Sequence, residues 1–546
     1  MVNLYLVAAS IEKSHLAFPL GSLAIYVSLL DDKEIEKETS LVHTHYYIDR
    51  DDPEAIARTL AKKNIDIMGL SIYLFNREWM NSFLKAFKTH SPHTTLFAGG
   101  PETIAHPDEL ITLGCSFLIL GEGEESTRVA LKKWLNKEII EGDGIYTKES
   151  NLATISYPND LSKLHSVLLH KSVNLKKYSG ILWELTRGCP YHCAFCFESK
   201  GTRSVRTYQF ERIEKELDAI INSKVEHVFV LDPTFNMSKQ RTVDLLTFLV
   251  QKSPSDIHYT FEIRAELLTT ESARLFGELY CSLQIGLQSS NVAVLKGINR
   301  LFDPILFKEK IGLLHTFDVV FGLDLIIGLP GDTYESFLES IDYTLSLRPS
   351  NIDIFLLSLL PGTELYDRKD QFALDYQTHT PYELIESDSM SKTDIQKALL
   401  VKEACDIFYT KGNAVMWFHI MLTPLQLSAS RFFILFASFL VEEHISSDDD
   451  TYEVQDMFIN RIYKEYRLSH LLPIVLSYIE MHQGISYLQE TGENPVVALS
   501  YEPEALALLD NHSVTWFYDR YKDKGKEKEY YLYASNGQIF FNVLDN

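Results

Sequence analysis

Three closely spaced cysteines constrain this chain more than any other feature of its sequence. Cys189, Cys193 and Cys196 are spaced C-x3-C-x2-C and follow the mostly apolar segment 181–185 and a glycine. This order predicts a buried strand that delivers all three thiols into one tight loop. A structural zinc ion takes four ligands, and a [4Fe–4S] cluster that only transfers electrons normally takes four thiolates, so three thiolates would leave one iron open to a small molecule. A zinc site completed by His192, inside the same loop, is the alternative.

Length and composition limit the class of protein. The chain has 546 residues, enough for two or three domains, and its formal net charge of -24 argues against binding along a nucleic-acid backbone. The three other cysteines are scattered, which indicates buried thiols rather than a disulfide framework. The N-terminus carries no basic leader, and the most apolar run, residues 432–441, is about half of the ~20 residues that a membrane span needs. We therefore expect a cytoplasmic protein without a transmembrane segment.

Residues 1–140 alternate between strand-like and helical patterns. Strand-like runs lie at 2–9, 40–47, 67–73, 95–99 and 117–120. Because parallel strands need crossover helices, this alternation predicts an α/β domain with a doubly wound, Rossmann-like parallel sheet. Ligands of such sheets bind beyond the carboxyl ends of the strands. Glycine-rich segments lie at three of these ends, at 69–76, 97–102 and 120–124, where glycine lets the backbone approach a large flat ligand.

The same alternation resumes after the cysteines. Strand-like runs recur at 227–231, 258–263, 281–287, 319–327 and 352–358. Together with the strand before the cysteines they predict a partial (β/α)6 TIM-like barrel over residues 181–365, with its chemistry at the carboxyl ends of the strands. A turn-rich linker, residues 141–180, joins this barrel to the first domain.

The barrel pattern stops near residue 365. Residues 366–546 predict a mostly helical domain, with long amphipathic patterns at 391–411, 427–443 and 454–483. A small β cap follows, with a hairpin around residues 535–537. No motif in this region predicts a particular chemistry.

The cysteine spacing, with Phe195 before the last cysteine, resembles the signature of the radical S-adenosylmethionine (SAM) superfamily. A glycine-rich sheet domain placed before this loop is similar to the cobalamin-binding domain of the B12-dependent class of that superfamily, and residues 366–546 resemble the uncharacterised C-terminal region of one of its subgroups. The resemblance implies that Cys189, Cys193 and Cys196 bind a [4Fe–4S] cluster whose open iron binds SAM. The Asp-x-His-x-x-Gly loop by which many cobalamin proteins replace the lower axial ligand of cobalt is absent.

The resemblance also assigns residues to the two other cofactors. SAM contacts are expected from Asp232, Pro233, Thr234, Glu262, Arg264, Gln284, Gln288 and Gly328. Cobalamin contacts are expected from Tyr73, Asn76, Gly99, Gly100, Pro101, Glu102, Gly121, Glu122, Gly123 and Glu124. Glu262 and Arg264, which share one strand face, could instead pair with each other. The corresponding alternative for the first domain is a nucleotide-type fold that binds no cofactor.

The function implied by the resemblance is that of a cobalamin-dependent radical SAM enzyme, a methyltransferase that acts on an unactivated carbon through a 5′-deoxyadenosyl radical and methylcobalamin. The alternatives are a radical SAM enzyme of non-methyl chemistry, such as cyclisation or ring contraction with auxiliary cobalamin, and a non-catalytic cobalamin or redox sensor. The expected partners are a small-molecule or peptide substrate and an electron donor of the flavodoxin or ferredoxin type. Residues 366–546 would form a lid, because a primary radical must be shielded from solvent.

Overall fold

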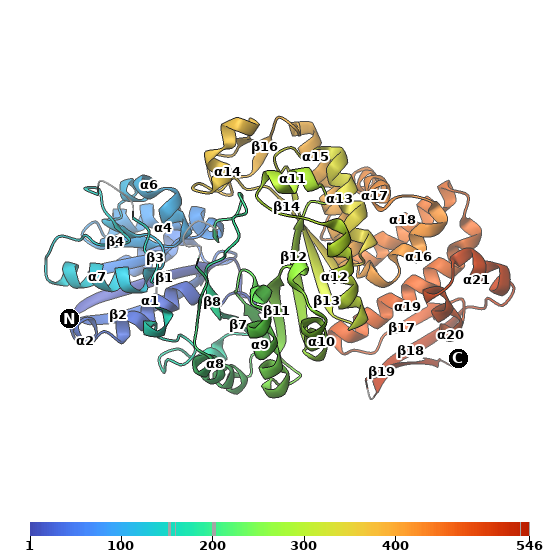
Figure 1. Cartoon of the computed structure of the whole chain (residues 1–546), viewed down its shortest axis with the longest axis horizontal. Coiled ribbons are helices and arrows are strands. Elements are labelled where there is room, and N and C mark those ends of the chain that lie inside the picture. Colours follow the sequence, from blue (N-terminus) through green and yellow to red (C-terminus); the bar gives the residue numbers. More distant parts are fainter. Residues whose placement is uncertain (151–153, 159, 199–203, 536, 545–546) are drawn as a thin grey trace. The chain divides into compact units, whose positions relative to one another are not determined.

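The computed structural model describes residues 1–150, 154–158, 160–198, 204–535 and 537–544. These residues form two compact units, and Figure 1 labels the helices and strands of both. The first unit contains Met1–Ile285, Leu295–Val319 and Leu357–Asp388, and the second contains Gly286–Val294, Val320–Leu356 and Ser389–Asn546.

The N-terminal domain of the first unit is built on a six-stranded sheet with the strand order β2-β1-β3-β4-β5-β6. Its strands are β1 (Val2–Ser10), β2 (Thr39–Tyr47), β3 (Ile67–Ser71), β4 (Thr95–Gly99), β5 (Phe117–Ile119) and β6 (Ile145–Tyr146). All neighbours pair in parallel except β5 and β6. The predicted doubly wound parallel sheet is confirmed. Strand β6 falls in the predicted linker, because two residues are too few to show a strand period.

Helices cover both faces of this sheet. They are α1 (Leu20–Leu30), α2 (Lys33–Glu38), α3 (Pro53–Ala61), α4 (Arg77–His90), α5 (Pro101–Ala105), α6 (Pro107–Thr112) and α7 (Gly123–Leu135). One hydrophobic core lies under α3 and α4, and a second lies under α1 and α7. Helix α4 buries an aromatic face. Trp79, Phe83 and Phe87 are spaced four residues apart and so lie on one side of the helix, where neighbouring ring centroids are 5.6 and 5.7 Å apart.

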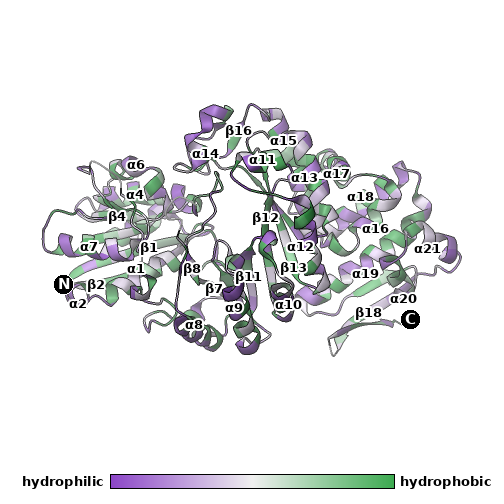
Figure 2. Ribbon diagram, in the orientation of Figure 1, coloured by the Kyte–Doolittle hydropathy of each residue, from purple (hydrophilic) through white to green (hydrophobic). Residues whose placement is uncertain are grey.

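The central sheet has the strand order β14-β13-β12-β11-β10-β7. Its strands are β7 (Gly180–Trp183), β10 (His227–Val230), β11 (His258–Ile263), β12 (Cys281–Gln288), β13 (Val320–Ile327) and β14 (Asn351–Leu356). The helices between them are α8 (Phe210–Ser223), α9 (Lys239–Lys252), α10 (Thr270–Glu278), α11 (Val292–Gly297), α12 (Pro304–Thr316) and α13 (Tyr334–Ser346). The consecutive strand order confirms the six predicted strand–helix units. In Figure 2 these strands are largely hydrophobic, whereas α8 is largely hydrophilic, as expected for an amphipathic helix with one face in solvent.

Two short strand pairs complete the first unit. Strands β8 (Thr186–Arg187) and β9 (Arg206–Thr207) are antiparallel and flank the cysteine loop. Helix α14 (Glu364–Asp367) and the antiparallel pair β15 (Asp375–Tyr376) and β16 (Leu384–Glu386) lie in the segment that returns to this unit after β14.

The C-terminal part of the second unit is mostly helical, as predicted. It contains α15 (Lys392–Cys405), a π-helix at Asp406–Lys411, α16 (Phe418–Leu422), α17 (Ala429–Glu443), α18 (Thr451–Glu465), α19 (Leu472–Thr491), α20 (Pro503–Leu506), α21 (Val514–Tyr521), β17 (Val496–Leu499), β18 (Lys528–Ser535) and β19 (Gln538–Val543). The predicted hairpin is β18–β19, although Asn536 at its turn lies outside the described residues.

One helical prediction in this region is wrong. The pattern over residues 454–483 forms two helices, α18 and α19, and not one. The chain breaks at Arg467, which has a φ of 58°. Pro473 lies in the first turn of the second helix, where a proline is tolerated because the first-turn N–H has no helical partner.

No helix among the described residues is by itself both long and apolar enough to cross a membrane. One bent pair, Phe418–Leu425 with Ala429–Glu443, passes the same length and composition test only when both helices are counted together, and the two meet at 91°.

Candidate functional site

The cysteine loop follows strands β7 and β8, as predicted. Its first two cysteines are buried, the third is half-buried, and none of them forms a disulfide. Backbone hydrogen bonds hold the loop from two sides: the N–H of Ala194 donates to the Ile298 carbonyl at 3.0 Å, and the N–H of Leu365 donates to the Ala194 carbonyl at 2.8 Å. Segments distant in sequence therefore fix the position of the thiols.

The electrostatics of the loop favour a bound cation. Burial raises the pKa of Cys189 and raises that of Cys196 to about 12, and the neighbouring cysteines add to both rises. Three thiolates held together therefore need compensating positive charge. Within the described ranges, no three His, Cys, Asp or Glu side chains converge to hold one metal ion.

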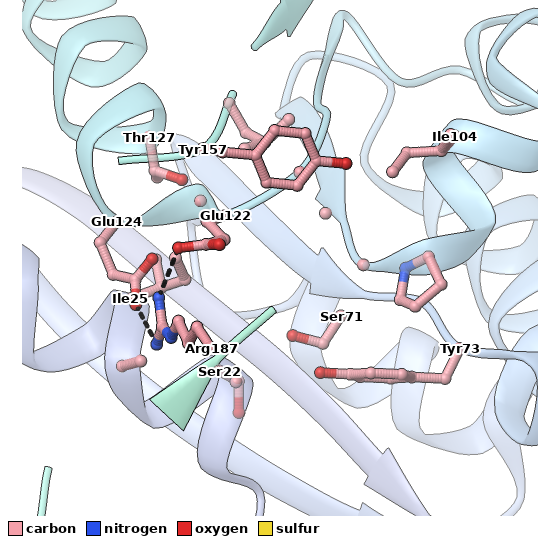
Figure 3. A pocket seen from close by; sticks show the side chains of 18 of the residues that line it. Ser22, Ile25, Ser71, Tyr73, Ile104, Glu122, Glu124, Thr127, Tyr157 and Arg187 are labelled. Carbon is pink, nitrogen blue, oxygen red and sulfur yellow. Dashed lines mark hydrogen bonds and ion pairs between the residues drawn. The ribbon is translucent and has the colours of Figure 1, made fainter. Parts of the chain in front are cut away.

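A cavity of about 420 Å³ lies beside the loop, at the carboxyl ends of the strands of the first sheet. All residues that line it belong to the first unit. Apolar groups such as Leu6, Ile25 and Phe97 come from the N-terminal domain, and Gly188 and Phe197 come from the cysteine loop. Figure 3 shows the polar part of this lining, where acidic side chains meet an arginine. A concave site with apolar walls and a few placed polar groups suits an organic ligand.

Two glycines at the end of β4 shape the cavity in different ways. Gly100 has a φ of 106°, and a Cβ there would lie 2.4 Å from the Ile72 carbonyl oxygen, so any other residue would be strained and would clash. Gly99 lines the cavity, and a Cβ there would meet only Ile119, at 3.8 Å. The first glycine is therefore required by the fold, whereas the second leaves space for a ligand.

The predicted cobalamin residues divide into two groups. Those that line the cavity are Tyr73, Gly99, Gly100, Pro101, Gly121, Glu122, Gly123 and Glu124. Asn76 and Glu102 do not. The Asn76 side chain accepts from the Tyr73 N–H at 2.8 Å and donates to the carbonyls of Ala9 and Ser71, which closes the turn after β3.

Glu102 belongs to a buried ion pair. Its carboxylate accepts from Arg77 at 3.0 Å and from the Tyr382 hydroxyl at 2.9 Å, and all three side chains are almost fully buried. Arg77 also pairs with the more exposed Glu109 at 2.8 Å. The group thus joins α4 and α5 to the segment between β14 and β16.

Several residues of the cavity do not follow from the strand-end pattern. Helices contribute Gly21, Ser22, Ile25 and Thr127, the linker contributes Tyr157, and the strands beside the cysteines contribute Arg187 and Arg206. The Ser22 hydroxyl also lies 2.8 Å from Nε2 of the half-buried His43. Only Arg187, next to the cysteine motif, had a sequence signal that could have drawn attention to it.

A network of charged side chains connects the two domains at this cavity. Arg187 donates to Glu122 at 3.0 Å and to Glu124 at 2.8 Å (Figure 3). It also donates to Glu184 at 2.9 Å. Arg206 pairs with Glu122 at 2.5 Å. Burial alone would raise the pKa of Glu124, but the charge of Arg187 and its hydrogen bond outweigh burial and hold that pKa below its usual value. The Glu124 carboxylate is therefore ionised at neutral pH.

The predicted SAM residues of the first unit lie at the ends of β10, β11 and β12. Asp232 accepts from the backbone N–H groups of Leu185 and Thr186, both at 2.9 Å, and burial raises its pKa to about 6. Pro233 lines the cavity, and the Thr234 hydroxyl donates to the Pro233 carbonyl at 2.7 Å. Asp232 thus anchors the backbone that leads to the cysteines.

Arg264 is held at the end of β11. Its backbone exchanges two hydrogen bonds with the Asn236 side chain, at 2.9 and 3.0 Å, and its guanidinium pairs with Glu266 at 2.6 Å and lies 3.9 Å from the Tyr191 ring centroid. The alternative of a pair with Glu262 is not what the structure shows, since the partner of Arg264 is Glu266. Gln284 is half-buried on β12.

Two further predicted SAM residues belong to the second unit. Gln288 ends β12 with a φ of 74°, and Gly328 follows β13 with a φ of 85°. A positive φ is strained for glutamine, which marks this strand end as a special backbone position.

The Glu262 carboxyl group leads to a prediction about how stability depends on pH. Its side chain reaches solvent, yet burial raises its pKa from 4.5 to about 7, and Glu198 adds repulsion. Between these two pH values the folded state keeps a proton on Glu262 that the unfolded state has already released. The free energy of unfolding therefore falls as pH rises through this window. We expect the urea midpoint of Glu262→Gln to fall less than that of the parent between about pH 5 and about pH 8. The exposed Glu211→Gln on α8 is the control, and equal pH dependence in both variants would contradict the prediction.

Comparison with known protein families agrees with this geometry. A family model described as the B12 binding domain matches residues 38–131, and one described as the Radical SAM superfamily matches residues 183–344. The first match covers most of the N-terminal sheet, and the second covers the cysteine loop and most of the central sheet.

Curated relatives match the same region. The cobalamin-dependent radical SAM methyltransferase TokK of Streptomyces tokunonensis is 24% identical over 334 residues, which are 55% of this chain and 48% of TokK. The hopanoid C-2 methylase of Rhodopseudomonas palustris is 24% identical over 304 residues, 54% of this chain and 55% of that enzyme. The chain thus matches about half the length of these relatives.

Solved structures share the fold over a larger part of the chain. The cobalamin-dependent S-adenosylmethionine radical enzyme OxsB, with aqua-cobalamin bound, aligns with a TM-score of 0.58 at 15% identity and covers 96% of this chain and 84% of its own. The radical S-adenosylmethionine methyltransferase TsrM from Kitasatospora setae aligns with a TM-score of 0.56 at 16% identity and covers 69% of this chain and 79% of its own.

The fold and the site define a protein with two cofactor-binding domains in sequence. It contains a B12-binding domain followed by a radical SAM domain. Because the OxsB alignment covers 96% of the chain, the C-terminal region is also part of a known fold.

Proposed function

We propose that this chain is a cobalamin-dependent radical SAM enzyme that transfers a methyl group to an unactivated carbon. The observation that carries the proposal is the cavity, which the strand ends of the B12-binding domain and the residues around the cysteine loop line together. One continuous space beside the thiols would let a cobalamin lie next to a cluster. The methyltransferase names of TokK and TsrM support methyl transfer as the reaction class.

The residues present fit the three cofactors. The three loop cysteines would hold a [4Fe–4S] cluster, with SAM on its open iron. Gly99 and the apolar side chains of the cavity would hold a corrin and its appended groups, with Tyr73 beside them. When bound, the cluster and SAM supply a carbon-centred radical and the cobalamin carries a methyl group. Arg264, with Glu266 and Tyr191 fixing its guanidinium, would bind the SAM carboxylate.

The chain's own part in this chemistry is binding, orientation and exclusion of water. Asp232 would hold the backbone before the cysteines through its two N–H partners. An external flavodoxin- or ferredoxin-type protein would supply the electron. The substrate would be a small molecule or a peptide.

The test needs no knowledge of the substrate. Anaerobically purified protein, reconstituted with iron, sulfide and hydroxocobalamin, is given SAM and a strong reductant. We expect iron–sulfur and corrin absorption bands, 5′-deoxyadenosine from radical cleavage of SAM, and S-adenosylhomocysteine that forms only when cobalamin is bound. Formation of 5′-deoxyadenosine without S-adenosylhomocysteine would indicate another radical reaction in place of methyl transfer. Both cofactor spectra with neither product would indicate a sensor and overturn the proposal.

A further inference from the structure

Arg187 joins the two parts of the site. It lies two residues before Cys189, on β8, and its side chain is 14% exposed. Its guanidinium reaches across to Glu122 and Glu124, which follow β5 of the B12-binding domain, and back to Glu184 of its own domain.

The geometry of these contacts leaves the guanidinium little freedom. Its Nε donates to both oxygens of Glu184 at 3.1 Å, its Nη1 donates to Glu122, and its Nη2 donates to Glu124 and Glu184. Because the guanidinium is planar and rigid, contacts on three edges fix both its position and its plane. Arg206 holds Glu122 from a second side and so keeps that carboxylate in place.

The network is better explained by a role in positioning the two domains' loops than by a contribution to stability. When two charged groups pair away from water, their lost hydration offsets much of their Coulomb attraction. A buried ion pair is therefore weak evidence for stability. What the network does achieve is a fixed distance between the loop after β5, which lines the cavity, and the backbone that leads to the thiols. Reactions between two held groups depend steeply on that distance, since a 1 Å displacement can cost about 10²-fold in rate.

We propose that Arg187 is a positioning residue that sets the distance between the cluster and the cobalamin, with Glu122 and Glu124 as its anchors. The inference rests on the proposed function, because it requires both cofactors to bind. Arg187 also lines the cavity, and its proposed effect on the cluster acts through the backbone of the cysteine loop.

The test measures the distance directly. A reduced [4Fe–4S] cluster and Co(II) cobalamin are both paramagnetic, and their dipolar coupling falls with the cube of their separation, so the EPR spectrum reports it without any turnover. The parent protein is expected to give one resolved coupling. Arg187→Lys keeps the charge but replaces the planar fork by a single ammonium, and Arg187→Met removes the charge; both are expected to lose the resolved coupling and give a broad distribution.

A matched control separates positioning from stability. Arg77→Met also strands a buried carboxylate, Glu102, but in a place that does not line the cavity. It is expected to keep the parent coupling at a temperature where it is folded.

Each outcome decides the matter. Parent-like coupling in both Arg187 variants, or equal loss of coupling in Arg77→Met, would overturn the positioning role. Products formed by a parent protein that shows no coupling would overturn it as well, while the proposed function would stand. Absence of both 5′-deoxyadenosine and S-adenosylhomocysteine in the parent would instead overturn the proposed function.

Discussion

Cys193→Ala is expected to abolish cluster assembly and, with it, every product of SAM. The variant leaves two thiolates in the loop, and a cluster that keeps one iron open for SAM has no further protein ligand to replace the missing one. The loop itself should survive, because Ala194 donates a backbone hydrogen bond to Ile298 and accepts one from Leu365, and neither bond involves the thiol. The loss would therefore be chemical and not a consequence of unfolding.

Iron and sulfide analysis after anaerobic reconstitution measures this effect. The parent should bind about four irons per chain and Cys193→Ala close to none. Cys115→Ala is the matched control, since Cys115 is also buried but lies beside β5 in the hydrophobic core of the B12-binding domain. A Cys193→Ala protein that keeps its iron and forms 5′-deoxyadenosine would show that these thiols do not hold the cluster.

The largest effect on stability is expected from Arg77→Met. Arg77 and Glu102 are 3.0 Å apart with side chains 3% and 5% exposed, and removing the cation leaves Glu102 buried with the Tyr382 hydroxyl as its remaining partner. Breaking one side of a buried pair typically costs about 3–5 kcal/mol. The free energy of unfolding should fall by that amount at neutral pH, measured by urea denaturation of the full chain.

The double variant Arg77→Met with Glu102→Leu distinguishes the stranded charge from lost packing. Replacing both charges by apolar groups of similar size removes the desolvation penalty, so most of the lost stability should return. If the double variant were no more stable than Arg77→Met alone, the cost would come from packing around α4 and not from an uncompensated carboxylate.

Local patterns were enough to predict the architecture. The alternation of strand and helix patterns predicted both parallel sheets, because each element buries one face and so carries its own period. The cysteine loop was equally predictable, since a strand, a glycine and three spaced thiols are adjacent in the chain. The break between α18 and α19 was missed because a helical period persists on both sides of Pro473.

The site was only partly predictable, and the predicted residues show why. Glycines such as Gly99 and Gly121 line the cavity as their position after strands suggests. Glu102 follows the same strand end, yet its carboxylate faces Tyr382, which is 280 residues away in the chain. No local pattern contains that partner.

The amino-acid order by itself determined which segments become strands and helices, and that three thiols share one loop, because these depend on side chains that are neighbours in the chain. Only the tertiary structure decided which carboxylates meet which cations. Glu122 and Glu124 meet Arg187 across 65 and 63 residues of sequence, and Glu102 meets Arg77 and Tyr382 instead of a ligand. Such pairs form where folding brings desolvated charges together, and a buried charge must take the partner that the fold places beside it.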